Sequence, residues 1–175
     1  MSDIKDKLIN IAMDTIQRSG INSLTMRELG EAVGIKSSSV MYHFKNKDGL
    51  IEALLKTYSK GFFEYLEEIN RTYKDKKTRL DKFVDIFESV FEDDKFCLCG
   101  MLAAENESLD DLISQNTQNF FQETQKWISA NLENNKNADE IAMVIISSLE
   151  GALLLDKLDS HSARINAVRL WIKSL

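Results

Sequence analysis

The stretch LTMRELGEAVGIKSSSVMYHFKNKDGL, residues 24–50, decides the fold of this chain. Thr25 followed by Glu28 has the spacing of a capping box, in which a hydroxyl and a carboxylate bond at the start of a helix. The apolar residues that follow predict a short helix over 26–33, and Gly34 is the residue type that ends a helix in the left-handed conformation. The stretch therefore begins with a short capped helix and a tight turn.

A second short helix follows this turn and reaches about Phe44. We expect the serines of 37–39 to cap its start through their hydroxyl groups. On a helical wheel, Val40 and Phe44 lie on one side together with Ser37. The opposite side holds small polar residues and one aromatic hydroxyl: Ser38, Ser39 and Tyr42. A helix that is anchored on one face and polar on the other suits a groove about 12 Å wide, the width of the DNA major groove.

The rest of the chain predicts helices as well. Apolar residues at helical spacing indicate a helix over about 3–19, ended by Gly20, and a long helix that runs to about residue 71. Five further helices are centred on 80–90, 101–107, 113–128, 141–155 and 160–174, with a polar loop at 131–137. The chain has no proline and only seven glycines, too few turn residues for a β-sandwich or barrel. We therefore expect an all-α protein of about nine helices.

The helix expected at 141–155 is apolar over most of its circumference. Such a helix must be buried on more than one side, and a helix so near the end of the chain has few partners within it. A homodimer through the last two helices would bury it, with the last helix contributing Val168, Trp171, Ile172 and Leu175. The alternative is a helix that passes through the core of a single chain.

The charge of the chain is divided unevenly. The net charge is −6, but residues 1–50 hold seven basic and six acidic residues, so the acidic excess lies in residues 51–175. Residues 36–47 contain three lysines and no acid, a local positive stripe of the kind that contacts phosphates. The longest apolar run, 141–146, is too short to span a membrane, and the first residues lack the apolar core of a secretory signal. These features predict a cytoplasmic protein with no membrane partner.

The residues of 24–35, 37–44 and 47–50 resemble the DNA-binding domain of the TetR repressor family, and the resemblance extends over residues 4–55. It implies an N-terminal three-helix, helix-turn-helix DNA-binding domain at 1–47, followed by a C-terminal helical ligand-binding and dimerisation domain at 48–175. It also implies a homodimeric repressor that leaves a pseudo-palindromic double-stranded DNA operator when a small-molecule effector binds.

The resemblance carries specific residues with it. In that family the residue at the position of Thr25 holds a phosphate, the recognition helix enters the major groove, and the lysine at the position of Lys47 contacts phosphate. The common pattern has tyrosine at the position of Met41, whereas this chain has it at Tyr42, as in a subgroup with Tyr-His-Phe at the end of the recognition helix. The expected DNA-binding residues are Thr25, Lys36, Ser37, Ser38, Ser39, Tyr42, His43 and Lys47. For His43 the alternative is a packing role, and for Lys36 it is a solvated side chain.

The resemblance places a small-molecule pocket within the C-terminal helices. The candidates for it are aromatic and methionine residues near the middle of those helices: Tyr58, Phe62, Phe87, Met101, Phe120, Trp127 and Met143. Each of them is also explained as an ordinary core residue, because apolar stripes occur whether or not a cavity exists. As a set they favour a largely apolar effector.

Cys97 and Cys99 allow three interpretations: buried small apolar residues, a metal site, or a sensor of electrophiles or redox state. Metal ligation needs about four donors, and the only histidines, His43 and His161, do not complete such a set. We expect no metal and no cofactor. The chain also lacks the glycine-rich phosphate loop, Gly-x-Ser-x-Gly and His-Glu-x-x-His motifs of common enzymes. Besides thiol sensing, the remaining alternative is a DNA-binding architectural or interaction protein with no effector.

Overall fold

The structure is a computed structural model that describes residues 4–132 and 135–175. Its contacts divide into two compact units. The first unit holds the described residues up to Gly61 together with Leu98–Gln118, and the second holds Phe62–Cys97 and Asn119–Leu175. The division predicted from the sequence, between residues 47 and 48, stays a prediction.

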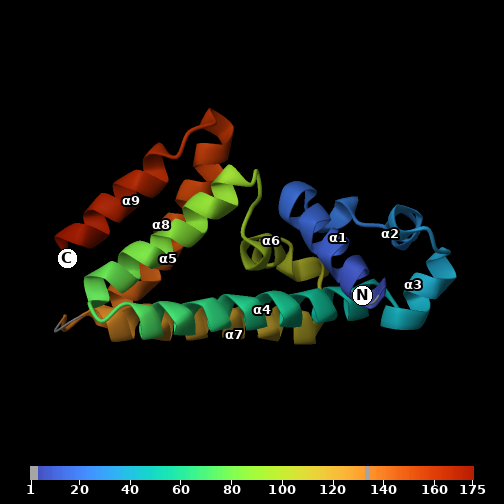
Figure 1. Cartoon of the computed structure of the whole chain (residues 1–175), viewed down its shortest axis with the longest axis horizontal. Coiled ribbons are helices and arrows are strands. Elements are labelled where there is room, and N and C mark those ends of the chain that lie inside the picture. Colours follow the sequence, from blue (N-terminus) through green and yellow to red (C-terminus); the bar gives the residue numbers. More distant parts are fainter. Residues whose placement is uncertain (1–3, 133–134) are drawn as a thin grey trace. The chain divides into compact units, whose positions relative to one another are not determined.

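The described residues form nine α-helices and two short 3-10 helices, so the all-α prediction is confirmed (Figure 1). In chain order they are α1 (Ile4–Ser19), η1 (Ile21–Ser23), α2 (Met26–Val33), α3 (Ser37–Phe44), α4 (Lys47–Thr72), α5 (Lys76–Glu92), α6 (Leu98–Ala104), η2 (Asn106–Ser108), α7 (Asp111–Asn131), α8 (Ala138–Asp159) and α9 (Ala163–Ser174).

The first unit contains the helix-turn-helix, α2 and α3. Gly34 ends α2 with φ of 76° and ψ of 28°, the left-handed conformation that glycine adopts without strain. Gly30 lies where the chain returns toward α3, and a Cβ there would come within 2.7 Å of the Ile35 carbonyl oxygen. A larger residue at position 30 would therefore push α3 away from α2. The tight turn expected from the sequence is confirmed.

The second unit packs α5, α8 and α9 against one another, and Figure 1 shows α8 and α9 as an antiparallel pair. The start of α9 is fixed by Asp156 of α8, a buried carboxylate. It accepts hydrogen bonds from the backbone amides of Arg164, at 3.0 and 3.1 Å to its two oxygens, and of Ile165, at 2.9 Å. Helices begin with amides that lack partners within the helix, and Asp156 supplies an acceptor for two of them.

Ion pairs hold α9 on α5. The guanidinium of Arg169 lies 2.6 Å from an Asp81 carboxylate oxygen, 2.8 Å from Asp85 and 2.7 Å from Glu88. These three acids lie on one face of α5, and the Arg169 side chain is mostly buried among them. Burial of a single arginine is tolerated here because three carboxylates surround it.

Two local predictions about helix starts need correction. The serines of 37–39 do not cap α3: its N-cap is Lys36, in extended conformation, and no side chain bonds there. The helix begins one residue earlier than capping by a serine would require, so the serines lie in its first turn. The sixth helix, expected at 101–107, spans Leu98–Ala104, because the apolar residues before Gly100 belong to its buried side.

Candidate nucleic-acid interface

The recognition helix α3 is anchored by two apolar side chains. Val40 is fully buried and Phe44 is nearly so. The Lys5 ammonium lies 5.8 Å from the centre of the Phe44 ring, which adds a cation–π contact from α1. Of the three residues expected on the anchored side of α3, Val40 and Phe44 are buried, whereas Ser37 is exposed.

The opposite side of α3 faces solvent. Tyr42 is 86% exposed, an unusual value for a large aromatic residue on an ordered helix, and Met41 beside it is also exposed. Ser37 and Ser38 are exposed and Ser39 is half buried. Met41 was not among the DNA-binding residues expected from the sequence, but it is exposed on the same side as Tyr42.

His43 is half buried between two aromatic rings. Its ring centre lies 5.7 Å from that of Tyr42, in an edge-to-face arrangement, and 6.1 Å from that of Phe44. Lys36, at the N-terminal end of α3, is exposed.

Thr25 and Glu28 form a variant of the capping box. The Thr25 hydroxyl oxygen accepts a hydrogen bond from the Glu28 amide at 3.2 Å and donates one to the Glu28 carboxylate at 2.6 Å. The first bond was expected. The carboxylate contacts the hydroxyl group, and Thr25 is exposed at the start of α2.

Lys47 lies at the first residue of α4, where its ammonium donates a hydrogen bond to the backbone carbonyl of Ile21 at 2.7 Å. An ammonium group has three N–H donors, so this bond leaves two for other acceptors. The bond could not be predicted from the sequence, because its partners are 26 positions apart.

Four of the seven effector candidates belong to one aromatic cluster of the second unit: Phe62, Phe87, Phe120 and Trp127. The ring centres of Phe62 and Phe120 are 4.7 Å apart, and Phe83, which was not among the candidates, lies 5.7 Å from both Phe87 and Trp127. The indole Nε1 of Trp127 is buried and has no hydrogen-bond partner among the described residues. A buried N–H group without an acceptor lowers the stability of the folded protein. An acceptor atom placed beside Trp127 Nε1 would therefore form a stabilising hydrogen bond.

The other three candidates lie elsewhere. Tyr58 and Met101 belong to the first unit, and both are half buried. Met143 is 51% exposed on α8. Met143 therefore lies at the surface and not in the aromatic cluster of the second unit.

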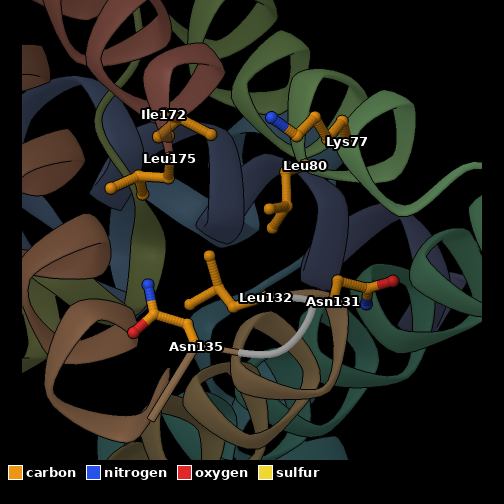
Figure 2. A pocket seen from close by; sticks show the side chains of 7 residues that line it. All are labelled: Lys77, Leu80, Asn131, Leu132, Asn135, Ile172 and Leu175. Carbon is orange, nitrogen blue, oxygen red and sulfur yellow. The ribbon is translucent and has the colours of Figure 1, made fainter. Parts of the chain in front are cut away.

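A pocket opens at one end of the second unit (Figure 2). Its empty volume is about 350 Å³, part of which is open solvent, and its wall is formed by Lys77, Leu80, Asn131, Leu132, Asn135, Ile172 and Leu175. In Figure 2 the side chains of Leu80 and Leu132 point toward the same space, whereas the amide of Asn131 points away from it. None of the seven effector candidates lines this pocket.

Cys97 and Cys99 are both buried thiols, in agreement with the interpretation as small apolar residues. Cys97 lies against Glu150 of α8. Burial raises the pKa of the Glu150 carboxyl to about 7, and a hydrogen bond with Cys97 opposes that rise in part. Among the described residues, no group of three or more histidine, cysteine or acidic side chains is placed to hold a metal ion.

We expect Glu150→Gln to weaken the pH dependence of stability. A carboxyl group whose pKa is raised by folding stabilises the protein below its unfolded pKa, near 4.5, and this contribution is lost as pH rises through about 7. Glutamine cannot ionise, so at pH 8 the variant should be more stable than wild type by about 3 kcal/mol. The measurement is the free energy of unfolding in urea at pH 5 and pH 8, at one fixed protein concentration.

Glu140→Gln, at an exposed position of the same helix, is the control. Identical pH profiles for Glu150→Gln and wild type would contradict the expectation.

One face of α8 carries exposed apolar side chains. Leu158 is 79% exposed and Leu154 is 56% exposed, and Met143, Val144 and Leu155 are exposed with them. Gly151 lies on the same helix, and no other atom comes within 4 Å of the place where its Cβ would be. Of the α9 residues expected at a dimer interface, Leu175 is exposed but Ile172 is buried within the chain, so its expected place in the interface was wrong. Leu170, which was not expected there, is exposed. We call the exposed residues of this group the α8–α9 apolar face.

A helix-turn-helix with a solvent-facing recognition helix, joined to helices with an exposed apolar face, defines a class of DNA-binding regulators. Comparison with known proteins gives the family. Residues 8–54 match the family described as bacterial regulatory proteins, tetR family, and residues 77–169 match the LmrA/YxaF-like C-terminal domain of transcriptional regulators. The chain belongs to the TetR family of transcriptional regulators, with a C-terminal domain of the LmrA/YxaF type, and it is not an enzyme.

Individual relatives agree with this assignment. The transcriptional repressor KstR2 of Mycolicibacterium smegmatis is 27% identical over 88 residues, a match that spans half of this chain and 42% of the repressor. The class A tetracycline repressor of Escherichia coli is 36% identical over 47 residues, or 27% of this chain and 22% of that repressor. The matched stretches therefore cover less than half of these relatives.

Solved structures match over nearly the whole length. A TetR transcriptional regulator from Legionella pneumophila, 28% identical, superposes with a TM-score of 0.94 over 99% of this chain and 97% of its own. The reduced form of Escherichia coli NemR, 17% identical, has a TM-score of 0.88 over 99% of this chain and 96% of its own and shares the fold. None of the helices described for this chain is both long and apolar enough to cross a lipid bilayer.

Proposed function

We propose that this chain is a cytoplasmic repressor that binds a pseudo-palindromic DNA operator as a homodimer and leaves it when a small, largely apolar effector binds. The observation that carries the proposal is Tyr42, exposed on a helix whose other face is locked by Val40 and Phe44. A rigid helix with a protruding aromatic hydroxyl can enter the major groove without reorganisation. In this proposal residues 1–47 form the DNA-binding domain and residues 48–175 the regulatory and dimerisation domain.

The proposed contacts divide into two kinds. Thr25 at the start of α2 and Lys47 at the start of α4 are placed as phosphate contacts, as helix starts and lysines commonly are. Lys36, the serines of 37–39, Tyr42 and His43 are the groups proposed to reach base edges or the adjoining backbone. The order Tyr42, His43, Phe44 supports assignment to the subgroup with Tyr-His-Phe at the end of the recognition helix.

We infer that the dimer forms through the α8–α9 apolar face. Exposed leucines cluster there, as expected of a surface that a second copy covers. Met143 lies on this face, and its exposure favours a role in the interface over one in the effector pocket.

For the effector, the aromatic cluster of Phe62, Phe87, Phe120 and Trp127 supports an apolar or aromatic compound. The buried Trp127 Nε1 donates to no group among the described residues, so we expect the effector to carry a hydrogen-bond acceptor that binds it. A thermal-shift screen of such compounds, followed by an operator-release assay, tests this part, because a ligand that binds the native state raises its melting temperature.

Thiol sensing through Cys97 and Cys99 stays a prediction, as does DNA binding without an effector. Release by electrophiles that survives replacement of both thiols by serine would contradict thiol sensing.

Replacing Tyr42 with alanine tests the recognition helix. We expect roughly a tenfold or greater loss of operator affinity, with unchanged helical content, because the side chain contributes nothing to the core. The measurement is a titration of a duplex selected in vitro from random sequences, repeated over a range of salt concentrations, where affinity should fall steeply as salt rises. Tyr65→Ala, at an exposed tyrosine of α4, is the control and should bind as wild type does. An unchanged affinity for Tyr42→Ala would remove α3 from the interface, and binding without sequence preference would contradict the repressor function.

A further inference from the structure

Both backbone polar groups of Ile21, its N–H and its carbonyl, bind side chains from distant parts of the first unit. The Ile21 amide donates a hydrogen bond to Oε1 of Glu105 at 3.1 Å. The Ile21 carbonyl accepts hydrogen bonds from the Lys47 ammonium at 2.7 Å and from the Leu24 amide at 3.2 Å. Glu105 follows α6 and lies 84 positions from Ile21 in the sequence. A carboxylate and an ammonium group thus bind the two backbone polar groups of one residue, Ile21, in the segment that joins α1 to α2.

Glu105 makes a second bond to the same segment. Its Oε2 accepts a hydrogen bond from the Asn22 side-chain amide at 3.1 Å. With one carboxylate oxygen on Ile21 and the other on Asn22, the carboxylate fixes the segment in orientation as well as in distance.

The backbone before this segment is shaped to allow the contact. Gly20 has φ of 83°, and a Cβ at this position would lie 3.2 Å from Glu105 Oε1 and 3.6 Å from the Met101 methyl carbon. A side chain here would face both backbone strain and crowding against Glu105. The glycine therefore permits the end of α6 to lie close against the turn after α1.

We infer that Glu105 is a positioning residue for operator binding, which acts through the Ile21 peptide and makes no contact with DNA. The inference rests on the proposed function. The segment held by Glu105 leads directly into Leu24, which is buried, and Thr25, which caps α2. Through it the end of α6 sets where α2 and the recognition helix lie relative to Lys47 and α4.

The sign of the expected effect separates this role from simple electrostatics. Removal of an acidic side chain from a DNA-binding protein reduces its repulsion from the phosphates, so it would leave affinity unchanged or increase it. A positioning role for Glu105 predicts instead that its removal lowers the affinity for the operator. The loss of the carboxylate frees the segment, and the ordering of the recognition helix must then be completed when DNA binds.

The experiment compares Glu105→Ala, Glu105→Gln and Glu107→Ala in the full chain with a duplex selected against wild type. Glu107 is an exposed acid in η2, so its replacement removes the same charge without touching the turn. We expect Glu105→Ala to bind about five- to tenfold more weakly than wild type, with an unchanged dependence on salt concentration. Glu105→Gln keeps an acceptor oxygen for the Ile21 amide and should lie within about twofold of wild type. Hydrogen exchange at the Ile21 amide should be faster in Glu105→Ala alone.

Equal affinities for Glu105→Ala and Glu107→Ala would overturn the inference while leaving the proposed function intact, because wild type would still bind the duplex. Failure of wild type to select any sequence would contradict the proposed function itself. If Glu105→Ala loses helical content, Asn22→Ala decides the question. It removes one of the two segment bonds at an exposed position, and an affinity equal to that of wild type would overturn the inference.

Discussion

Replacing Leu154 with glutamate is expected to convert the homodimer to a monomer and to lower operator affinity by about 100-fold or more. Leu154 lies within the α8–α9 apolar face, where an ionised carboxylate would lose its hydration when a second copy covers it. A pseudo-palindromic operator is bound by two linked recognition helices, and loss of the link removes the gain from simultaneous binding, commonly 10²- to 10⁴-fold. The measurements are the molar mass in solution by light scattering and a titration with the selected duplex.

Leu112→Glu is the matched control for this prediction. Leu112, at the start of α7, is 47% exposed, so the substitution introduces the same charge at a similarly exposed leucine outside the α8–α9 apolar face. It should leave both molar mass and affinity unchanged. A dimeric Leu154→Glu variant with wild-type affinity would show that the interface lies elsewhere.

Replacing Asp156 with alanine is expected to lower the free energy of unfolding by about 2 to 5 kcal/mol, because two backbone amides lose a buried acceptor at a cost of about 1 to 3 kcal/mol each. The carboxylate is fully buried, binds the first amides of α9 and receives the Arg164 guanidinium at 3.1 Å. Alanine would leave those amides without acceptors, which is costlier than the loss of the bonds alone. Chemical denaturation at a fixed protein concentration measures the change.

Asp159→Ala is the control, because Asp159 binds the same guanidinium at 2.5 Å but is exposed. Surface ion pairs contribute about 0 to 1 kcal/mol, so this variant should be nearly as stable as wild type.

The pH dependence of the free energy of unfolding gives a second check. Burial of Asp156 raises its pKa, but hydrogen bonds from Ile165 and Arg164 outweigh this and the pKa is lowered from 3.8. Its stabilising contribution is therefore present above the unfolded pKa and lost as pH falls below it. Similar stabilities for the two alanine variants would contradict the prediction.

The helix-turn-helix could be predicted from the sequence because its determinants are local. The bounds of α2 follow from the pair Thr25 and Glu28 at one end and Gly34 at the other, all within ten residues. The division of α3 into an anchored face and an exposed face follows from helical periodicity alone. The predicted cap of α3 was wrong. Three serines in a row offer equivalent hydroxyls, and the backbone conformation at Lys36 decides which residue precedes the helix.

The contacts of Glu105, Lys47 and Glu150 could not be predicted, because each joins residues that are distant in the sequence. No periodicity or motif indicates that a glutamate after α6 bonds to the turn after α1. Glu150 lies in the mostly apolar middle part of α8, and that setting was the signal in the sequence of its burial. For the effector candidates, helical spacing identified aromatic residues but could not show which of them share a cluster.

The carboxylate cap at Asp156 has a consequence for assembly. Because a side chain of α8 fixes the start of α9, the two helices form a hairpin whose geometry is set within a single chain. Two copies that meet through this hairpin would find a preorganised surface and would lose little conformational entropy on association. The monomer produced by Leu154→Glu should accordingly remain folded and keep its helical content, so that assembly and folding can be measured as separate equilibria.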